Sequence, residues 1–155
     1  MKPYQYAIIG GTGVYDTGVS SFQKTVKTEF GEVEVDISEF EKNSIVFLAR
    51  HGKDHVTPPH LINYRANLKA LQKLGVKHIF ATAAVGSLNR DFPTGSLVIL
   101  SDFIDMTKHR PLTFFEGGFE GTKHVNMDDP YCTYLRKNLL ETARENDFRF
   151  KGDAV

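Results

Sequence analysis

The sequence is poor in cysteine, with Cys132 as the only one in 155 residues. A lone cysteine excludes an intramolecular disulfide and any zinc module built on several cysteines, which fits a reducing cytoplasm. Cys132 lies just inside an expected helix, beside Tyr131, and no base is evident nearby. We therefore expect this thiol to have a packing role and the protein to be cytoplasmic.

Long apolar runs and an excess of one charge are also missing. No stretch approaches the roughly 18 apolar residues that a membrane span needs, and the N-terminus lacks the features of a signal peptide. Lys plus Arg and Asp plus Glu both number 19, so the formal net charge is zero. Affinity for nucleic acid or anionic membranes depends on clustered positive charge. We expect neither among the partners of this protein.

What the sequence does contain is an alternation of strand-like and helical periods. Apolar residues make up 41% and charged residues 25%, as in ordinary globular proteins. The alternation predicts an α/β fold with a mixed or mostly parallel sheet flanked by helices. Continuous or alternating apolar runs predict strands at residues 6–10, 29–40, 44–49, 77–85, 96–105 and 149–155.

Helical spacing of apolar residues appears twice. Residues 60–75 carry Leu61, Leu68 and Leu71 at this spacing and end in Gly75, which suits a C-terminal cap. A second helix is expected to start at Asp129 as N-cap, with Pro130 in the first helical position. Its apolar stripe consists of Leu135, Leu139, Leu140 and Ala143.

Between these elements, residues 105–129 show no period, and glycines interrupt them. We expect a long loop there. The chain ends on the strand at residues 149–155 with nothing to cover it. We therefore interpret residues 1–155 as a single α/β domain that is part of a larger one and appears cut short at its C-terminus.

The segment GGTGVYD, residues 10–16, follows the first strand. It is not the dinucleotide fingerprint, because Asp16 stands where a third Gly or Ala is needed, and no Gly-Lys-Ser/Thr follows to make a Walker loop. A turn whose amides point inward, with the Thr12 hydroxyl among them, suits an anion. A plain strand-ending turn is about equally plausible from the motif alone.

Arg50 and His51 end the strand at residues 44–49. Arginine binds phosphate or carboxylate oxygens in a bidentate way, and histidine adds one directional donor. A salt bridge at a strand end would be the ordinary explanation. An anion site is favoured because the first strand and the strand at residues 77–85 also end in small, glycine-bearing loops. Ligands of open α/β sheets gather at such carboxyl ends.

The third strand end, ATAAVGSLN, offers backbone rather than side chains. Ala83 and Ala84 have no functional groups, so their contribution would be exposed N–H donors beside Gly86. His51, His55 and His60 invite a zinc interpretation, but the spacing does not match a metal motif, and we expect no metal.

Two features lie in the expected loop. Phe114 and Phe115 belong to the segment PLTFFEGGF, which suits a subunit contact or a lid over an apolar ligand. His124 follows in the same loop.

Several short motifs occur in a fixed order: IIGGTG, LARHG, NYRANL, AVGSL, PTGSLV, DFIDMTKHRP and HVNMDDPYC. Each is weak alone, but the ordered set resembles the trimeric purine nucleoside phosphorylases and, among them, most resembles the 5′-methylthioadenosine phosphorylase branch. The resemblance runs from the first strand to Val155.

The resemblance implies phosphorolysis of a purine nucleoside without a cofactor, with inorganic phosphate as co-substrate. Thr12, Arg50, His51, Ala83 and Ala84 would bind the phosphate. At Ala83, where a compared family member has threonine, only the main-chain donor carries over.

By the same resemblance, His124, with Phe114 and Phe115, would reach a neighbouring subunit's pocket near the 5′-alkylthio group in a homotrimer. The acid that protonates the leaving purine belongs to the second half of the family's chain, so no residue of this sequence is assigned as catalytic.

Three alternatives stay open at this point. The substrate is a 6-aminopurine nucleoside, with methylthioadenosine preferred, or a 6-oxopurine nucleoside or methylthioinosine. The chain is also interpretable as an inactive fragment that binds phosphate or associates with other subunits. A nucleotide-binding module without catalysis is disfavoured, because both phosphate-loop fingerprints fail.

Overall fold

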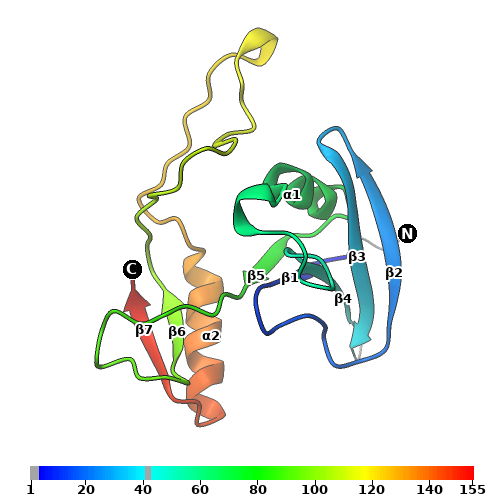
Figure 1. The fold of residues 1–155 in the computed structure, drawn as a ribbon. Helices are drawn as coiled ribbons and strands as arrows, with labels where there is room; N and C mark the ends of the chain where they lie inside the picture. Colours follow the sequence, from blue (N-terminus) through cyan, green and yellow to red (C-terminus); the bar gives the residue numbers. More distant parts are fainter. Residues whose placement is uncertain (1–3, 41–42) are drawn as a thin grey trace. The chain divides into compact units, whose positions relative to one another are not determined.

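A five-stranded mixed sheet forms the N-terminal part of the chain (Figure 1). The computed structural model describes residues 4–40 and 43–155. They form two compact units that divide between Val85 and Gly86. The expectation of one domain over residues 1–155 stays a prediction.

The sheet of the first unit has the strand order β2-β3-β4-β1-β5. β4 pairs in parallel with β1, and β1 pairs in parallel with β5, whereas β2, β3 and β4 are antiparallel neighbours. The predicted mixed sheet with flanking helices is confirmed. The strands are β1 (Tyr6–Gly10), β2 (Ser21–Thr28), β3 (Gly31–Phe40), β4 (Asn43–Ala49) and β5 (His78–Ala81).

β2 was not among the strands expected from the sequence, and β5 is shorter than the predicted 77–85. β2 lies at the edge of the sheet, and Val26 is the one residue of the strand classed as buried. An edge strand that buries so little has a weak apolar pattern, which explains why the pattern missed it. By contrast β4, predicted as a central strand, lies in the middle of the sheet and buries Val46, Phe47 and Leu48.

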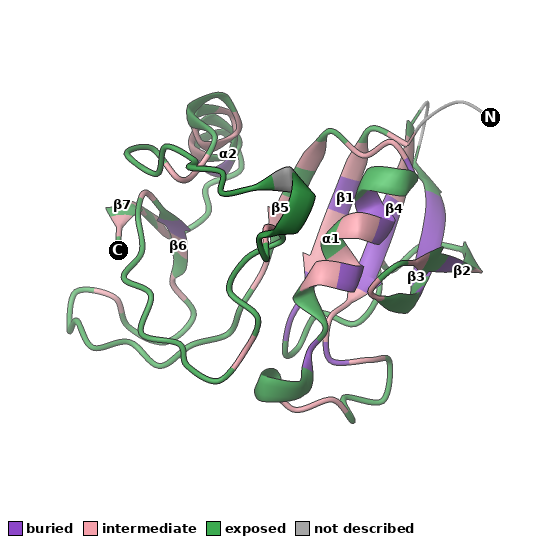
Figure 2. Ribbon diagram, turned by 90° about the horizontal axis from the view of Figure 1, so that it is seen from above, coloured by how far each residue is buried: buried purple, intermediate pink, exposed green. Residues whose placement is uncertain are grey.

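α1 (Tyr64–Lys73) follows a short 3-10 turn, η1 (Pro59–Leu61), and covers one face of this sheet (Figure 2). The Asn63 side chain caps the helix by accepting a hydrogen bond from the Ala66 amide at 3.0 Å. Gly75 adopts the left-handed conformation (φ 84°) after the last turn, as predicted. The apolar core consists of Ala7, Val26, Val33, Val35, Ile37, Val46 and Leu48 with Ala66, Ala70, Leu71 and Leu74.

The helix does not bury all the leucines expected of it. Leu61 is 65% exposed and Leu68 is 41% exposed, whereas Ala66, Ala70 and Leu71 are the buried residues of α1. Two alanines on the buried stripe let the helix backbone approach the sheet closely, and Leu71 is the large side chain of α1 that packs in this contact face.

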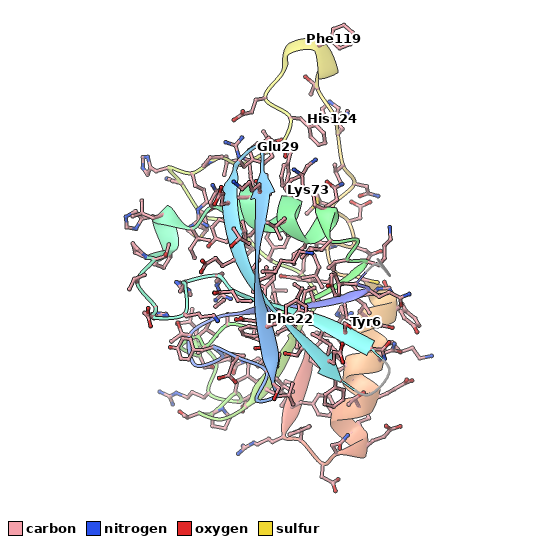
Figure 3. The ribbon with its side chains drawn as sticks, turned by 90° about the vertical axis from the view of Figure 1, so that its right-hand side faces the viewer. Tyr6, Phe22, Glu29, Lys73, Phe119 and His124 are labelled. Carbon is pink, nitrogen blue, oxygen red and sulfur yellow. The ribbon has the colours of Figure 1, made fainter. Side chains whose placement is uncertain are left out.

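Ion pairs fasten the β2–β3 turn to α1, and Figure 3 shows Glu29 beside Lys73. The Nζ atoms of Lys69 and Lys73 lie 3.1 and 3.7 Å from the Glu29 carboxylate. A backbone hydrogen bond and one from Lys69 hold the pKa of the Glu29 carboxyl below its ordinary value.

The second unit contains a two-stranded parallel sheet, β6 (Leu97–Leu100) with β7 (Phe150–Ala154), and the helix α2 (Thr133–Glu145). Ile99 and Ala143 are its buried apolar residues. The loop between β6 and α2 runs far out from the sheet and returns (Figure 1), with one 3-10 turn, η2 (Gly118–Glu120). The predicted long loop and final strand are confirmed, whereas the strand predicted at 96–105 is shorter.

The predicted start of α2 is wrong. Cys132 is the N-cap residue, and the helix begins at Thr133 rather than after Asp129 and Pro130. Cys132 is also exposed, so the packing role expected of its thiol is wrong. In the part of the chain that the structure describes, no helix has the length and apolar character needed to cross a membrane.

The packing of α1 can be tested by truncating Leu71, which is 1% exposed. Leu71→Ala is expected to lower the free energy of unfolding by about 2–5 kcal/mol, because it leaves a cavity between helix and sheet. Leu68→Ala, on the exposed side of the same helix, is the matched control and should cost less than half as much. Denaturant unfolding measures both, and equal losses would show that the buried face of α1 is misassigned.

Candidate functional site

Three parallel strands end side by side in the first unit. Gly10 at the end of β1 is in register with Ala49 at the end of β4, and Ile9 is in register with Ala81 at the end of β5. The chain therefore leaves all three strands at the same edge of the sheet. The segments that follow the three strands are the glycine-rich turn after β1, the Arg50-His51 pair after β4 and residues 82–84 after β5. Ligands of open α/β sheets bind at such carboxyl ends of strands.

Arg50 is fixed across the start of the glycine-rich turn. Its backbone N–H donates to the Gly10 carbonyl at 3.2 Å, and its guanidinium donates to the Thr82 carbonyl. The Gly11 amide in turn donates to the Thr82 hydroxyl at 3.3 Å. A Cβ on Gly11 would overlap both the Arg50 guanidinium and the Thr82 carbonyl. Glycine is thus required there, because the arginine lies directly against the turn.

His51 is held in a defined tautomer. It is 7% exposed, and its Nδ1 lies 2.9 Å from the Thr57 carbonyl oxygen. A carbonyl oxygen can only accept a hydrogen bond, so Nδ1 carries a hydrogen and Nε2 is the ring nitrogen left for a ligand. The His55 ring stacks at a tilt on His51, with ring centroids 4.6 Å apart.

One cavity of about 670 Å³ opens at this edge of the sheet. The structure brings together around it the five residues that the sequence suggested for an anion. The sequence motifs did not indicate Val56, Thr57, Pro58 and Pro59, which also line the cavity, because these residues carry no anion-binding signature. The lining residues are Thr12, Arg50, His51, His55, Val56, Thr57, Pro58, Pro59, Ala83, Ala84 and Val85.

The electrostatics of this cavity suit an anion. Arg50 supplies a permanent positive charge, and none of the described residues that line the cavity is acidic. Thr12, Ala83 and Ala84 are exposed, so the threonine hydroxyl and the backbone of the two alanines are accessible. The arrangement can orient a small tetrahedral oxyanion by charge and hydrogen bonds.

A smaller cavity of about 380 Å³ lies in the second unit. It sits at the amino ends of β6 and β7, where ligands of open α/β sheets are not usually bound. Its wall combines the acid Asp91 with the basic residues Arg90, Arg149 and Lys151. The first cavity is the stronger candidate.

The remaining predicted residues belong to the second unit, in the long loop before α2. Phe114 is 41% exposed, and Phe115 is half-buried with the Lys123 ammonium 4.8 Å from its ring centroid. His124 is exposed and lies near the outer end of the loop with Phe119 (Figure 3). Their part in a neighbouring subunit's pocket stays a prediction.

Among the described residues, no group of three or more His, Cys, Asp or Glu side chains is arranged to hold a metal ion. That no metal takes part stays a prediction.

The fold and the cavity define a class of protein. The model of the phosphorylase superfamily matches residues 5–152, and the chain belongs to this family. A probable 6-oxopurine nucleoside phosphorylase of Thermococcus kodakarensis is 48% identical over 93% of this chain and 57% of its own. An S-methyl-5′-thioadenosine phosphorylase of Hyperthermus butylicus is 48% identical over 92% of this chain and 53% of its own.

Solved structures agree with this assignment. The methylthioadenosine phosphorylase from Schistosoma mansoni in complex with tubercidin is similar at a TM-score of 0.85 and 37% identity. The match covers 93% of this chain and 53% of that one. The nucleoside phosphorylase fold and the predicted family are thus confirmed. The chain spans about half the length of the curated relatives it matches.

The contact between Arg50 and the glycine-rich turn can be tested by Gly11→Ala. The new methyl group would overlap the Thr82 carbonyl and the Arg50 guanidinium, so one of them must move. Overpacking of this kind is expected to cost about 1–3 kcal/mol, measured by denaturant unfolding. Gly86→Ala is the control, since nothing lies near its added Cβ. Equal stability of both variants would contradict the described packing.

Proposed function

We propose that the chain supplies the phosphate site of a purine nucleoside phosphorylase. In this reaction inorganic phosphate displaces a purine from the anomeric carbon of a nucleoside. With 5′-methylthioadenosine, the substrate we favour, the products are adenine and 5-methylthioribose 1-phosphate. The single observation that carries the proposal is the acid-free cavity where three parallel strands end, lined by both Arg50 and His51.

The proposed phosphate contacts follow from the donors around that cavity. Arg50 provides guanidinium N–H groups beyond the one bound to Thr82. The Thr12 hydroxyl and the amides of Ala83 and Ala84 add neutral donors. His51 provides Nε2, which donates when the ring is protonated and accepts a hydrogen from a protonated phosphate oxygen when it is neutral.

This arrangement would promote phosphorolysis by orientation and charge. As the glycosidic bond breaks, the sugar develops oxocarbenium-like positive charge next to the bound phosphate. A phosphate held in place stabilises this charge without reorganisation, and one of its oxygens then bonds to the anomeric carbon. The electron pair of the broken bond leaves with the purine, which takes up a proton.

The group that protonates the purine is not assigned within residues 1–155. We propose that it comes from the part of the family's chain length that this sequence does not cover, as the family resemblance implies. Asp153 is not a substitute, and its carboxylate is engaged by the Arg136 guanidinium.

The choice of purine depends on the ordered motifs rather than on the names of the relatives. The curated relatives include enzymes named for 6-oxopurine nucleosides and for methylthioadenosine, at equal identity to this chain. The ordered motifs favour methylthioadenosine, with 6-oxopurine nucleosides or methylthioinosine as the alternative substrates. The proposal also includes a cytoplasmic homotrimer without cofactor, in which His124, Phe114 and Phe115 complete a neighbouring subunit's pocket.

A second candidate function is an inactive chain that binds phosphate or associates with other subunits. It predicts phosphate binding without turnover, which the following experiment separates from phosphorolysis.

The test measures purine release from methylthioadenosine by the protein that contains this chain, with and without inorganic phosphate. Release should require phosphate, and Arg50→Ala should raise the KM for phosphate by about tenfold to a hundredfold, since hydrogen bonds to a charged group are lost. Arg90→Ala, an exposed arginine outside the cavity, is the matched control.

Release that is independent of phosphate would refute the proposed reaction. An unchanged phosphate KM in Arg50→Ala would refute the assigned site while leaving the reaction class standing. Phosphate binding by calorimetry together with no release would favour the inactive chain.

A further inference from the structure

We infer that Asp36 and Ser38, on β3, are positioning residues for the phosphate site. They hold the loop after β4, which carries Arg50 and His51, and the loop after β1, which carries Thr12. Neither Asp36 nor Ser38 lines the cavity. The inference rests on the proposed function, because it assigns these residues a role in phosphate affinity and not only in folding.

The burial of these side chains is the first observation. Within the described residues, the polar or charged residues classed as buried are Asp36, Ser38 and His51. Burying a polar group costs free energy unless a partner satisfies it. Asp36 and Ser38 are hydrogen-bonded to loops at the cavity edge of the sheet. His51 is hydrogen-bonded to Thr57 in its own loop.

Strand geometry places the two β3 residues on one face. Val35 and Ile37 belong to the apolar core under α1, and side chains alternate along a strand. Asp36 and Ser38 therefore project from the opposite face, which α1 does not cover. A hydrophobic core residue would serve at either position if packing were the only requirement.

Asp36 holds the loop that follows β4. Lys53, in the same loop as Arg50 and His51, places its ammonium 2.8 Å from the Asp36 carboxylate. The loop is closed on itself by a hydrogen bond from the Thr57 amide to the His51 carbonyl at 2.9 Å. The ion pair thus attaches this loop, and with it the His51 ring, to β3, which is separated from β1 by β4 in the sheet.

Ser38 holds the turn that follows β1. Its hydroxyl lies 2.7 Å from that of Thr17, which belongs to the loop that carries Thr12. Two hydrogen bonds within the loop also hold it. The Val14 amide donates to the Gly11 carbonyl at 3.0 Å, and the Gly18 amide donates to the Asp16 carboxylate at 2.7 Å. One strand face therefore fastens both loops at adjacent positions.

These contacts order the loops before the anion binds. The Lys53 side chain is 52% exposed and the Asp36 side chain 11%, so water screens the lysine end of the ion pair while the buried carboxylate needs its partner. Restricting the loops before the anion arrives removes an entropy cost from binding. Small misplacements of binding groups lower affinity or rate strongly.

The test compares Asp36→Asn, Ser38→Ala and Lys53→Met by calorimetry with inorganic phosphate and by amide hydrogen exchange. Each variant is expected to weaken phosphate affinity about tenfold. Asp36→Asn and Lys53→Met should speed exchange in residues 51–57, whereas Ser38→Ala should speed it in residues 12–18. Lys53→Arg, which keeps the charge, should restore wild-type affinity. A merely structural role would loosen both loops together.

Glu34→Gln is the matched control, because Glu34 projects from the same face of β3 and its carboxylate accepts a hydrogen bond from the Gln23 side chain of β2 at 3.2 Å. It should leave phosphate affinity unchanged. Wild-type affinity in Asp36→Asn and Ser38→Ala would overturn the inference and leave the proposed function intact. A wild-type protein that binds no phosphate would overturn both the proposed site and the role inferred here.

Discussion

The parallel pairing of β1 with β4 on one side and β5 on the other is the constraint on which the candidate site depends. It makes three strands end at one edge, so residues far apart in the sequence leave the sheet next to each other. Arg50 can then reach the Thr82 carbonyl across the Gly11 backbone, although these residues belong to three different loops. A different strand order would leave each loop as an ordinary turn.

The antiparallel part of the sheet adds a second requirement. β3 is not one of the strands that end at the site, yet it carries the buried polar residues Asp36 and Ser38. Its apolar face packs under α1, and its opposite face contacts the loops after β1 and β4. Folding of the core and ordering of the site are thus linked through alternate residues of one strand.

Much of this arrangement could be predicted from sequence because local patterns encode it. The apolar runs of β1 and β4, the alternation of Val33, Val35 and Ile37, and the glycine after α1 all gave elements that the structure contains. The rule that ligands collect at carboxyl ends of strands then brought Thr12, Arg50 and Ala84 to one place, and the structure sets all three around one cavity.

What could not be predicted depends on tertiary neighbours. β2 was missed because an edge strand buries little, and the start of α2 was misplaced because Asp129 and Pro130 carry a capping signal that the fold does not use. The pairs of Asp36 with Lys53 and of Ser38 with Thr17 join residues that no local motif connects. Val56 and Thr57 were also missed as lining residues of the cavity, because neither carries an anion-binding signature.

The central claim is that these separate loops bind one tetrahedral anion. A crystal structure of the protein grown with inorganic phosphate tests it most directly. We predict a single phosphate ion with the Thr12 hydroxyl, the Arg50 guanidinium, His51 Nε2 and the Ala84 amide each about 2.7–3.2 Å from one of its oxygens. A phosphate bound elsewhere, or these four groups directed at different positions with no shared ion, would contradict the account.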